Sequence, residues 1–180
     1  MRKIAIVGVE ATGKSTLAEQ LAQHYQTLWV REYAREYLHN LKRKYTFDDV
    51  LAIAQGQQKL IEQTIAQNVH LPIIFIDTEL LVTHIWCEYV FGKHHAWISE
   101  HLHKQNYDLY LLCDIDLPWE YDELREQPDL AKRKEIHALY LYYLQKLRFP
   151  YQIISGEGEV RLQNAIGAVN FRFFDRNFQK

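Results

Sequence analysis

The residues with the clearest chemistry are those of segment 8–15, GVEATGKS, which fits the pattern G-x-x-x-x-G-K-[ST]. The glycines of this pattern allow a tight loop whose backbone N–H groups face a phosphate, and the lysine reaches the β- and γ-phosphates. We therefore predict that this phosphate loop binds a nucleoside triphosphate. The residues expected to contact the nucleotide are Gly8, Glu10, Ala11, Thr12, Gly13, Lys14, Ser15 and Thr16.

A second group of polar residues follows an apolar segment. Residues 71–76, LPIIFI, have the composition of a buried strand, and Asp77 comes next. An acidic residue in this position is typical of a Walker B site, so we predict that Asp77 and the Ser15 hydroxyl bind Mg²⁺. A structural role is the alternative, in which Asp77 or Thr78 caps a helix over residues 80–91. The two roles are compatible.

Charged residues also follow a second expected strand, at residues 27–30. They are Glu32, Arg35 and Glu36. Ligands bind at the carboxyl ends of strands in open α/β sheets, so these side chains are candidates for contact with the substrate. The same spacing fits a solvent-exposed helix face with charges three and four residues apart. The pattern does not favour either interpretation.

A charged segment, residues 116–134, is interrupted by Pro128. We predict that it forms a short lid, because lids of phosphoryl-transfer enzymes exclude water and supply arginines that neutralise the transferred group. Arg125 and Arg133 are the candidates for that role. The alternative is a solvated loop whose charges serve solubility. An amphipathic helix is expected to follow, over about residues 136–147.

A long helix is expected between residues 46 and 68, with Thr46 as its N-cap. Gly56 interrupts it, which indicates the close approach of another element or a ligand. A glutamine amide can read a base or amide edge through its donor and acceptor, although surface glutamines are equally compatible with the pattern. The glutamines beside Gly56 are Gln55, Gln57 and Gln58.

Histidines gather between residues 92 and 103. Their spacing fits no strong zinc pattern, and Cys87 is not near enough in sequence to complete one. We therefore predict a polar connector between two helices. The histidines concerned are His94, His95, His101 and His103.

These groups need a scaffold that brings the ends of several strands together. Apolar runs separated by segments of helical periodicity predict an α/β fold, a doubly wound, mainly parallel sheet within one domain over residues 1–180. A last helix is expected to reach about Val169, and residues 170–180 either pack on the body or contact a neighbour. The five expected strands are 4–7, 27–30, 71–76, 107–113 and 150–154.

The overall composition excludes several classes of partner. The chain has 180 residues, is 48% hydrophobic and carries a net charge of −2, so there is no general electrostatic attraction to nucleic acid. It has no apolar run long enough to span a bilayer, and no signal peptide is apparent. We therefore expect a cytoplasmic protein with a small-molecule substrate and no nucleic-acid or membrane partner. The oligomeric state stays open.

Taken together, these segments resemble the ribosylnicotinamide kinase domain of NadR-type proteins, from Lys3 to about Val169. The phosphate loop is shared by many families, whereas the other motifs are more specific. The resemblance implies a P-loop kinase, for which the commoner strand order is 2-3-1-4-5. The specific motifs are residues 32–37 (EYAREY), 53–58 (IAQGQQ), 75–78 (FIDT) and 119–125 (WEYDELR), with Arg133 at matching spacing.

The resemblance implies an activity. Members of the family use ATP and Mg²⁺ to phosphorylate the 5′-hydroxyl of nicotinamide riboside, which gives nicotinamide mononucleotide. It implies metal binding by Ser15 and Asp77, and a lid function for Arg125 and Arg133. No H-x-G-H nucleotidyl-transfer motif is present, so we expect the reaction to stop at the mononucleotide.

The general base is left with two candidates. Similarity to deoxynucleoside kinases points to Glu32, and Asp77 competes with it; either must reach the 5′-hydroxyl within hydrogen-bond distance. Trp86 is a further candidate for contact with a cationic ring. The expected catalytic residues are Lys14, Glu32, Asp77, Arg125 and Arg133. The expected substrate-binding residues are Glu32, Tyr33, Arg35, Tyr37 and Gln58.

Two other functions stay open at this point. One is a kinase for another nucleoside or for a nucleotide, whose own phosphate would need Arg31, Arg35 or Lys42. The other is an ATP-binding regulator that senses a pyridine nucleotide without phosphorylating it. A GTPase is disfavoured, because the sequence has no N-K-x-D guanine-reading motif.

Overall fold

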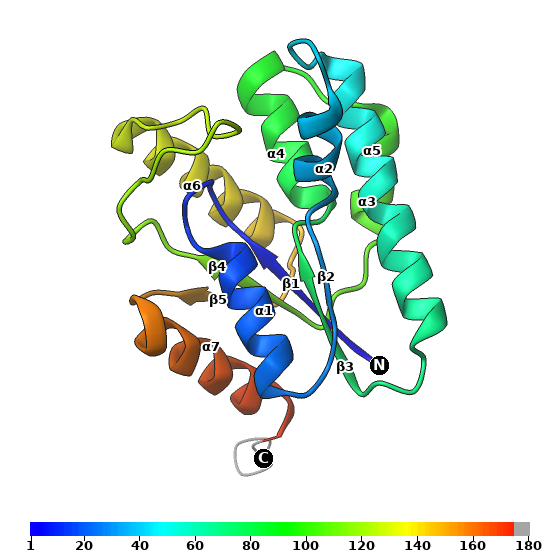
Figure 1. Ribbon diagram of the computed structural model, residues 1–180, viewed down its shortest axis with the longest axis vertical. Helices are drawn as coiled ribbons and strands as arrows, with labels where there is room; N and C mark the ends of the chain where they lie inside the picture. Colours follow the sequence, from blue (N-terminus) through cyan, green and yellow to red (C-terminus); the bar gives the residue numbers. More distant parts are fainter. Residues whose placement is uncertain (175–180) are drawn as a thin grey trace.

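A computed structural model describes residues 1–174, and its central feature is a five-stranded parallel sheet (Figure 1). The strand order β2-β3-β1-β4-β5 confirms the predicted 2-3-1-4-5 arrangement. Every pairing is parallel, with Ile4 of the central strand opposite Phe75 on one side and Leu109 on the other. The strands are β1 (Arg2–Val7), β2 (Trp29–Val30), β3 (Ile73–Asp77), β4 (Leu109–Cys113) and β5 (Tyr151–Ile154).

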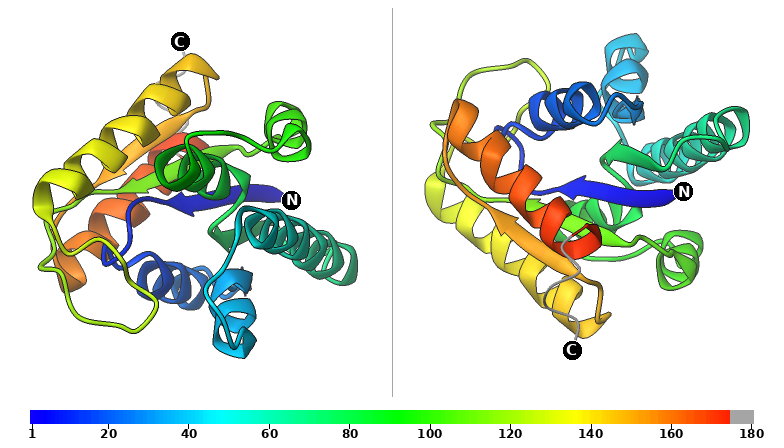
Figure 2. Two further views of the ribbon diagram at one scale, coloured as in Figure 1. Left: turned by 90° about the horizontal axis from the view of Figure 1, so that it is seen from above. Right: turned by 90° about the horizontal axis from the view of Figure 1, so that it is seen from below.

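Seven helices are described, and they cover both faces of the sheet (Figure 2). None of them combines the length and the apolar character needed to cross a membrane. Residues 175–180, the end of the predicted tail, lie outside the described part of the chain. The helices are α1 (Lys14–His24), α2 (Tyr33–Asn40), α3 (Phe47–Gln67), α4 (Leu80–Phe91), α5 (Ala96–Lys104), α6 (Leu130–Lys146) and α7 (Gly158–Phe173).

Each face of the sheet has its own hydrophobic core. Successive strand residues point to opposite faces, so Ile4 and Ile6 pack against α1 and α7, while Ala5 and Val7 face the side covered by α3 to α6. The central strands are buried on both faces, which explains why they read as continuous apolar runs. This arrangement leaves the carboxyl ends of the strands free for a site.

Several predicted boundaries were wrong by a few residues. Strand β2 has two residues instead of four, and α6 begins at Leu130 instead of about 136. The early start of α6 comes from Asp129, whose side chain accepts from the N–H groups of two residues in the first turn. Helix α4 is capped by Glu79, which accepts from the Leu81 N–H at 2.9 Å, and not by Asp77 or Thr78.

The long helix α3 agrees with its prediction at both ends and at its glycine. Thr46 is the N-cap and forms a capping box with Asp49. At Gly56, an added Cβ would lie 2.1 Å from the nearest ring atom of Tyr33. The close approach is therefore the aromatic ring of α2, which seats that helix on α3.

We expect Gly56→Ala to destabilise the protein by about 1–3 kcal/mol, because the new methyl group would push the Tyr33 ring and α2 away from α3. Gly167→Ala in α7 is the matched control. That exposed position has open space around it, so alanine should stabilise the helix by about 0.5–1 kcal/mol. Urea unfolding of both variants measures the two changes. A stabilised Gly56→Ala variant would contradict this account of α2 packing.

Candidate active site

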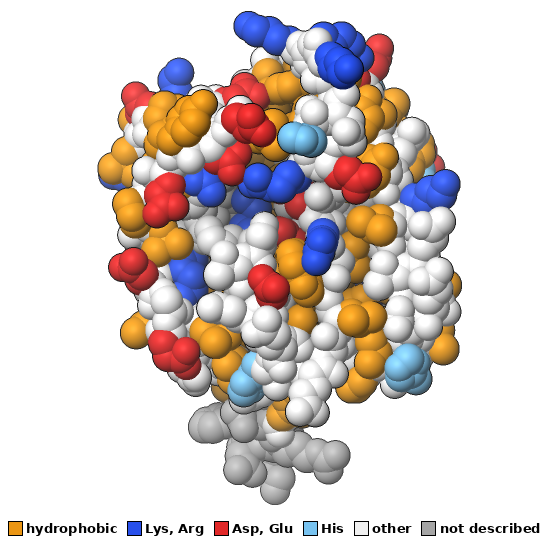
Figure 3. Space-filling model, viewed as in Figure 1, with side chains coloured by type: hydrophobic (Ala, Val, Ile, Leu, Met, Phe, Trp, Pro, Cys, Tyr) orange, Lys and Arg blue, Asp and Glu red, His pale blue; other side chains and the backbone are white. Residues whose placement is uncertain are grey.

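A cavity of about 400 Å³ lies at the carboxyl ends of the central strands. Its walls come from the phosphate loop, from α2, α3, α4 and α6, and from the irregular β4–α6 segment (residues 114–129). Figure 3 shows Lys and Arg side chains gathered around a hollow on one face, with Asp and Glu side chains close by. A second cavity of about 640 Å³ is lined by Ser15, Glu32 and Arg35, which also line the first, and by Asp77.

The phosphate loop has the backbone that its glycines predict. Gly8 has φ of 142° and Gly13 has φ of 73°, and an added Cβ at Gly8 would lie 2.9 Å from the Cys113 carbonyl oxygen. Gly13 is also the N-cap of α1, so the positive end of that helix dipole points into the loop. Loop and helix together form a site suited to an anion.

The carbonyl groups of the loop are bound by cationic side chains from other helices. Arg133 of α6 donates to the Ala11 carbonyl at 3.4 Å, and Arg161 of α7 donates to the Thr12 carbonyl at 3.2 Å. No cis peptide bond occurs among residues 1–174, so the N–H of each of these peptide units points away from its carbonyl group. Cations behind the loop thus orient N–H groups for a ligand.

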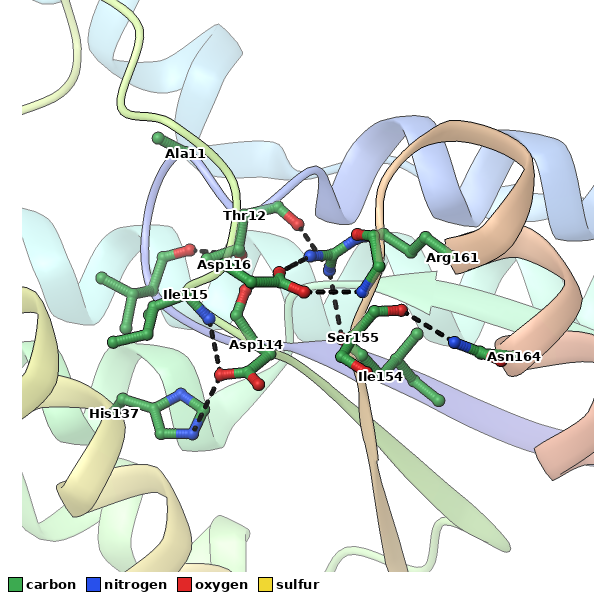
Figure 4. Close-up of polar contacts among 12 residues, drawn as sticks. Ala11, Thr12, Asp114, Ile115, Asp116, His137, Ile154, Ser155, Arg161 and Asn164 are labelled. Atoms are coloured by element: carbon green, nitrogen blue, oxygen red, sulfur yellow. Dashed lines mark hydrogen bonds and ion pairs between the residues drawn. The ribbon is translucent and has the colours of Figure 1, made fainter.

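Arg161 belongs to a network that sequence analysis missed (Figure 4). It is 4% exposed, pairs with the Asp116 carboxylate and donates to the Gly156 carbonyl at 2.7 Å. Asp116 in turn accepts from the Gly156 N–H at 2.6 Å. These contacts join α7, the phosphate loop and the start of the β4–α6 segment. The only signal in the sequence is one arginine on the apolar side of the last helix.

Asp77 has an unusual electrostatic position. It is 1% exposed, and its pKa is raised from 3.8 to about 6, chiefly by burial and then by the Glu32 carboxylate, while Lys14 lowers it. Its Oδ2 atom has no hydrogen-bond partner. A buried carboxylate oxygen without a partner beside the Ser15 hydroxyl fits a hard cation with oxygen ligands, as Mg²⁺ requires.

Glu32 is held in place by a glutamine of α3. The Gln57 side chain accepts from the Tyr33 N–H at 2.7 Å and donates to the Arg31 carbonyl at 3.2 Å, so it binds the backbone on both sides of Glu32. Glu32 lines both cavities. Of the glutamines noted in the sequence, Gln57 therefore forms hydrogen bonds with the backbone. Gln58 donates to Glu62 and lines neither cavity.

The β4–α6 segment is fastened to the phosphate loop by Glu10. The Glu10 carboxylate accepts from the N–H groups of Glu126 and Gln127, at 2.9 and 2.5 Å, and from the Trp119 indole at 3.3 Å. Arg125 of the same segment lines the cavity. The segment thus closes one side of the cavity through a residue of the loop itself.

The remaining predicted residues are divided between the cavities and the scaffold. Arg35 lines both cavities and pairs with Asp122 at 3.1 Å, which links α2 to the β4–α6 segment. Tyr33 lines the second cavity but not the first. Tyr37 lines neither, because its hydroxyl donates to Asp49 at 2.8 Å. Arg133 also lies outside both cavities, on α6 and behind the phosphate loop.

Aromatic side chains form the wall farther from the loop. The Trp86 indole donates to the Tyr45 hydroxyl at 3.1 Å, and both residues line the first cavity. Tyr140 of α6 lies on the same lining, together with apolar residues of α2 and α3. Sequence analysis named Trp86 but missed Tyr45 and Tyr140. One end of the cavity is therefore polar and cationic, and the other can contact a flat ring.

Comparison with known proteins places the chain in a family. Residues 3–161 match the family described as AAA domain, so the chain belongs to that family of P-loop proteins. The trifunctional NAD biosynthesis/regulator protein NadR of Escherichia coli K12 is 29% identical over 161 residues, which are 87% of this chain and 39% of the relative. The resemblance predicted from the motifs is thereby confirmed.

Solved structures agree with this assignment. A crystal structure of NadR protein in complex with NR matches with a TM-score of 0.76 and 26% identity, covering 95% of this chain and 51% of that one. Thymidylate kinase of Ehrlichia chaffeensis, at 15% identity, shares the fold with a TM-score of 0.68 over 93% of this chain and 98% of its own. The fold is that of the nucleoside and nucleotide kinases. The chain spans about half or less of its NadR relatives.

We expect Asp77→Asn to stabilise the protein at pH 8 by up to about 3 kcal/mol when EDTA is present. The pKa of Asp77 is raised in the folded state, so ionisation of the buried carboxyl costs stability as pH rises from about 4 through about 6. The gain should therefore shrink towards zero near pH 4. Urea unfolding across this range measures it, with Glu135→Gln on the surface as control; a gain independent of pH would contradict the assignment.

Proposed function

We propose that the protein is a nucleoside kinase that transfers the γ-phosphoryl group of ATP to the 5′-hydroxyl of nicotinamide riboside. The observation that carries the proposal is one cavity that runs from the phosphate loop to an aromatic wall, with Glu32 on its lining. The NadR structure at 26% identity is a complex with NR, which supports the same class of ligand here. We assign the whole chain to one kinase domain, with the β4–α6 segment as its lid.

The phosphate loop would hold the triphosphate. The N–H groups oriented by Arg133 and Arg161 and the dipole of α1 suit the phosphate oxygens, and Lys14 reaches the β- and γ-phosphates from the first turn of that helix. Lys14 now donates to the Val9 carbonyl at 3.0 Å, a contact that a phosphate oxygen would replace. Arg125, on the cavity lining, would neutralise charge on the transferred group.

Ser15 and Asp77 would hold Mg²⁺, directly or through water. When bound, the ion would supply positive charge to the phosphate oxygens. Asp77 has the raised pKa of a carboxyl in a poorly hydrated place, and a nearby cation would favour its charged form. A carboxylate that holds Mg²⁺ is not available to accept a proton, so under this assignment Asp77 is not the general base.

Glu32 is therefore our choice for the general base. It lines the cavity next to the phosphate loop, and Gln57 fixes its backbone from both sides. Its carboxylate would accept the proton of the 5′-hydroxyl as that oxygen attacks the γ-phosphorus. The cationic nicotinamide ring would lie against Trp86, whose position is fixed by its bond to Tyr45.

A product assay tests the activity. We expect purified protein with ATP, Mg²⁺ and nicotinamide riboside to form nicotinamide mononucleotide and ADP in equal amounts. Chromatography measures both products. Lys14→Ala should lose the activity, because it removes the charge that stabilises the transferred group. Other nucleosides and nucleoside monophosphates serve as alternative acceptors. If only one of these alternative acceptors is phosphorylated, the assigned substrate is wrong and the assignment as a kinase stands. If ATP binds and no product forms with any acceptor, the protein is better explained as a sensor.

The two acidic residues should separate in their effects. We expect Glu32→Gln to lower kcat about 10²–10⁴-fold with little change in the Mg²⁺ requirement, as loss of a general base does. Asp77→Asn should raise the Mg²⁺ concentration needed for half-maximal activity. Glu19→Gln, an exposed carboxylate of α1 that lines neither cavity, is the matched control. If Glu32→Gln and not Asp77→Asn changed the Mg²⁺ requirement, Glu32 would be the metal ligand and Asp77 the general base.

A further inference from the structure

A cluster of metal-ligating side chains lies away from the cavity, on the side of α4 that faces α6. One nitrogen each of His84 and His94 and one carboxylate oxygen of Glu88 lie within 4.8 Å of one another. None of these residues lines either cavity, although Trp86, on the same helix, does. The cluster is therefore separate from the proposed phosphoryl-transfer site.

The local fold explains how the three side chains meet. His84 and Glu88 are four residues apart on α4 and so lie on one face of the helix. Helix α4 ends at Phe91, and its C-cap is Gly92, which has a left-handed φ of 62° and an N–H that donates to the Glu88 carbonyl at 2.9 Å. This turn sends the chain back, so that His94 reaches Glu88 with 3.4 Å between Nε2 and Oε2.

A second observation is the unsatisfied polar atom of His84. This residue is 5% exposed, and its Nδ1 atom has no hydrogen-bond partner. A buried polar atom without a partner is costly, and binding of an ion or a water molecule is one reason for it to persist. His94 and Glu88 are partly exposed, with about a third of each side chain accessible, so an ion can reach the cluster from solvent.

From these contacts we propose that His84, Glu88 and His94 form a binding site for a divalent transition-metal ion of the Zn²⁺ class. Two imidazoles and a carboxylate are a donor set that Zn²⁺ accepts, with one position left for water. Mg²⁺ prefers oxygen ligands alone, and no thiolate is among the three ligands for a softer ion.

The surroundings fit this site. The Tyr143 hydroxyl of α6 donates to Glu88, which orients the carboxylate as outer-shell partners of metal ligands do. The two imidazole rings are stacked, with 4.0 Å between centroids and an angle of 7°. Binding must tilt the rings out of this stack, because the lone pair of an imidazole nitrogen lies in the plane of its ring, and two nearly parallel planes do not converge on one ion. The bound ion would join α4 to the connection between α4 and α5, and α6 would contact the site only through the hydrogen bond of Tyr143 to Glu88.

Zinc titration of the untagged, chelator-treated protein tests the proposal. We expect one Zn²⁺ per chain by competition with a chromophoric chelator, and a higher melting temperature that EDTA reverses. His94→Ala and Glu88→Gln should each weaken zinc binding at least about tenfold and remove the thermal shift. Co²⁺ should give the absorption spectrum of a tetrahedral site in the original protein and not in these variants.

Two controls locate the ion. His70→Ala removes an exposed histidine outside the cluster and should leave zinc binding unchanged. Asp77→Asn alters the proposed Mg²⁺ site and should also leave it unchanged. Zinc bound with equal affinity by His94→Ala and the original protein, zinc lost in Asp77→Asn, or no zinc bound at all would each overturn the proposal.

Discussion

The site depends on how the carbonyl groups of the phosphate loop are satisfied. Buried carbonyl oxygens need partners, and here two of them take guanidinium groups from α6 and α7, which lie far along the chain. These bonds fix which way the peptide units face, and hence where their N–H groups point. A motif in the first 16 residues is therefore shaped by helices in the last third of the chain.

The second constraint is the crowding of charge at the end of β3. Burial and the Glu32 carboxylate both act against ionisation of Asp77, and only Lys14 and nearby hydroxyls favour it. The next residue, Thr78, has φ of 70°, an unfavourable conformation for a β-branched side chain. Strain and unfavourable charge at adjacent residues are typical of sites where function, and not stability, determines the local structure.

Features fixed by near neighbours in sequence were predictable. The phosphate loop, the Thr46 cap and the bounds of α4 follow from local patterns, although the residue that caps α4 does not. The strand order was implied by the resemblance to P-loop kinases. The features that the sequence did not predict depend on contacts between residues that are not neighbours in the chain. Arg133 was expected in the lid but lies behind the loop, since α6 begins early at the Asp129 cap. Arg161 has only the weak signal of a charged residue on an apolar helix face, and the meeting of His84 with His94 has no local signal.

Glu10 combines two properties that are usually kept on separate residues. It belongs to the phosphate loop, and it holds the β4–α6 segment through three hydrogen bonds. A polyphosphate on the loop brings several negative charges close to this carboxylate, and removal of the polyphosphate takes them away. The strength of the three Glu10 hydrogen bonds is therefore expected to change with the negative charge bound to the loop. Occupation of the loop and the position of the β4–α6 segment would thus be coupled through one side chain.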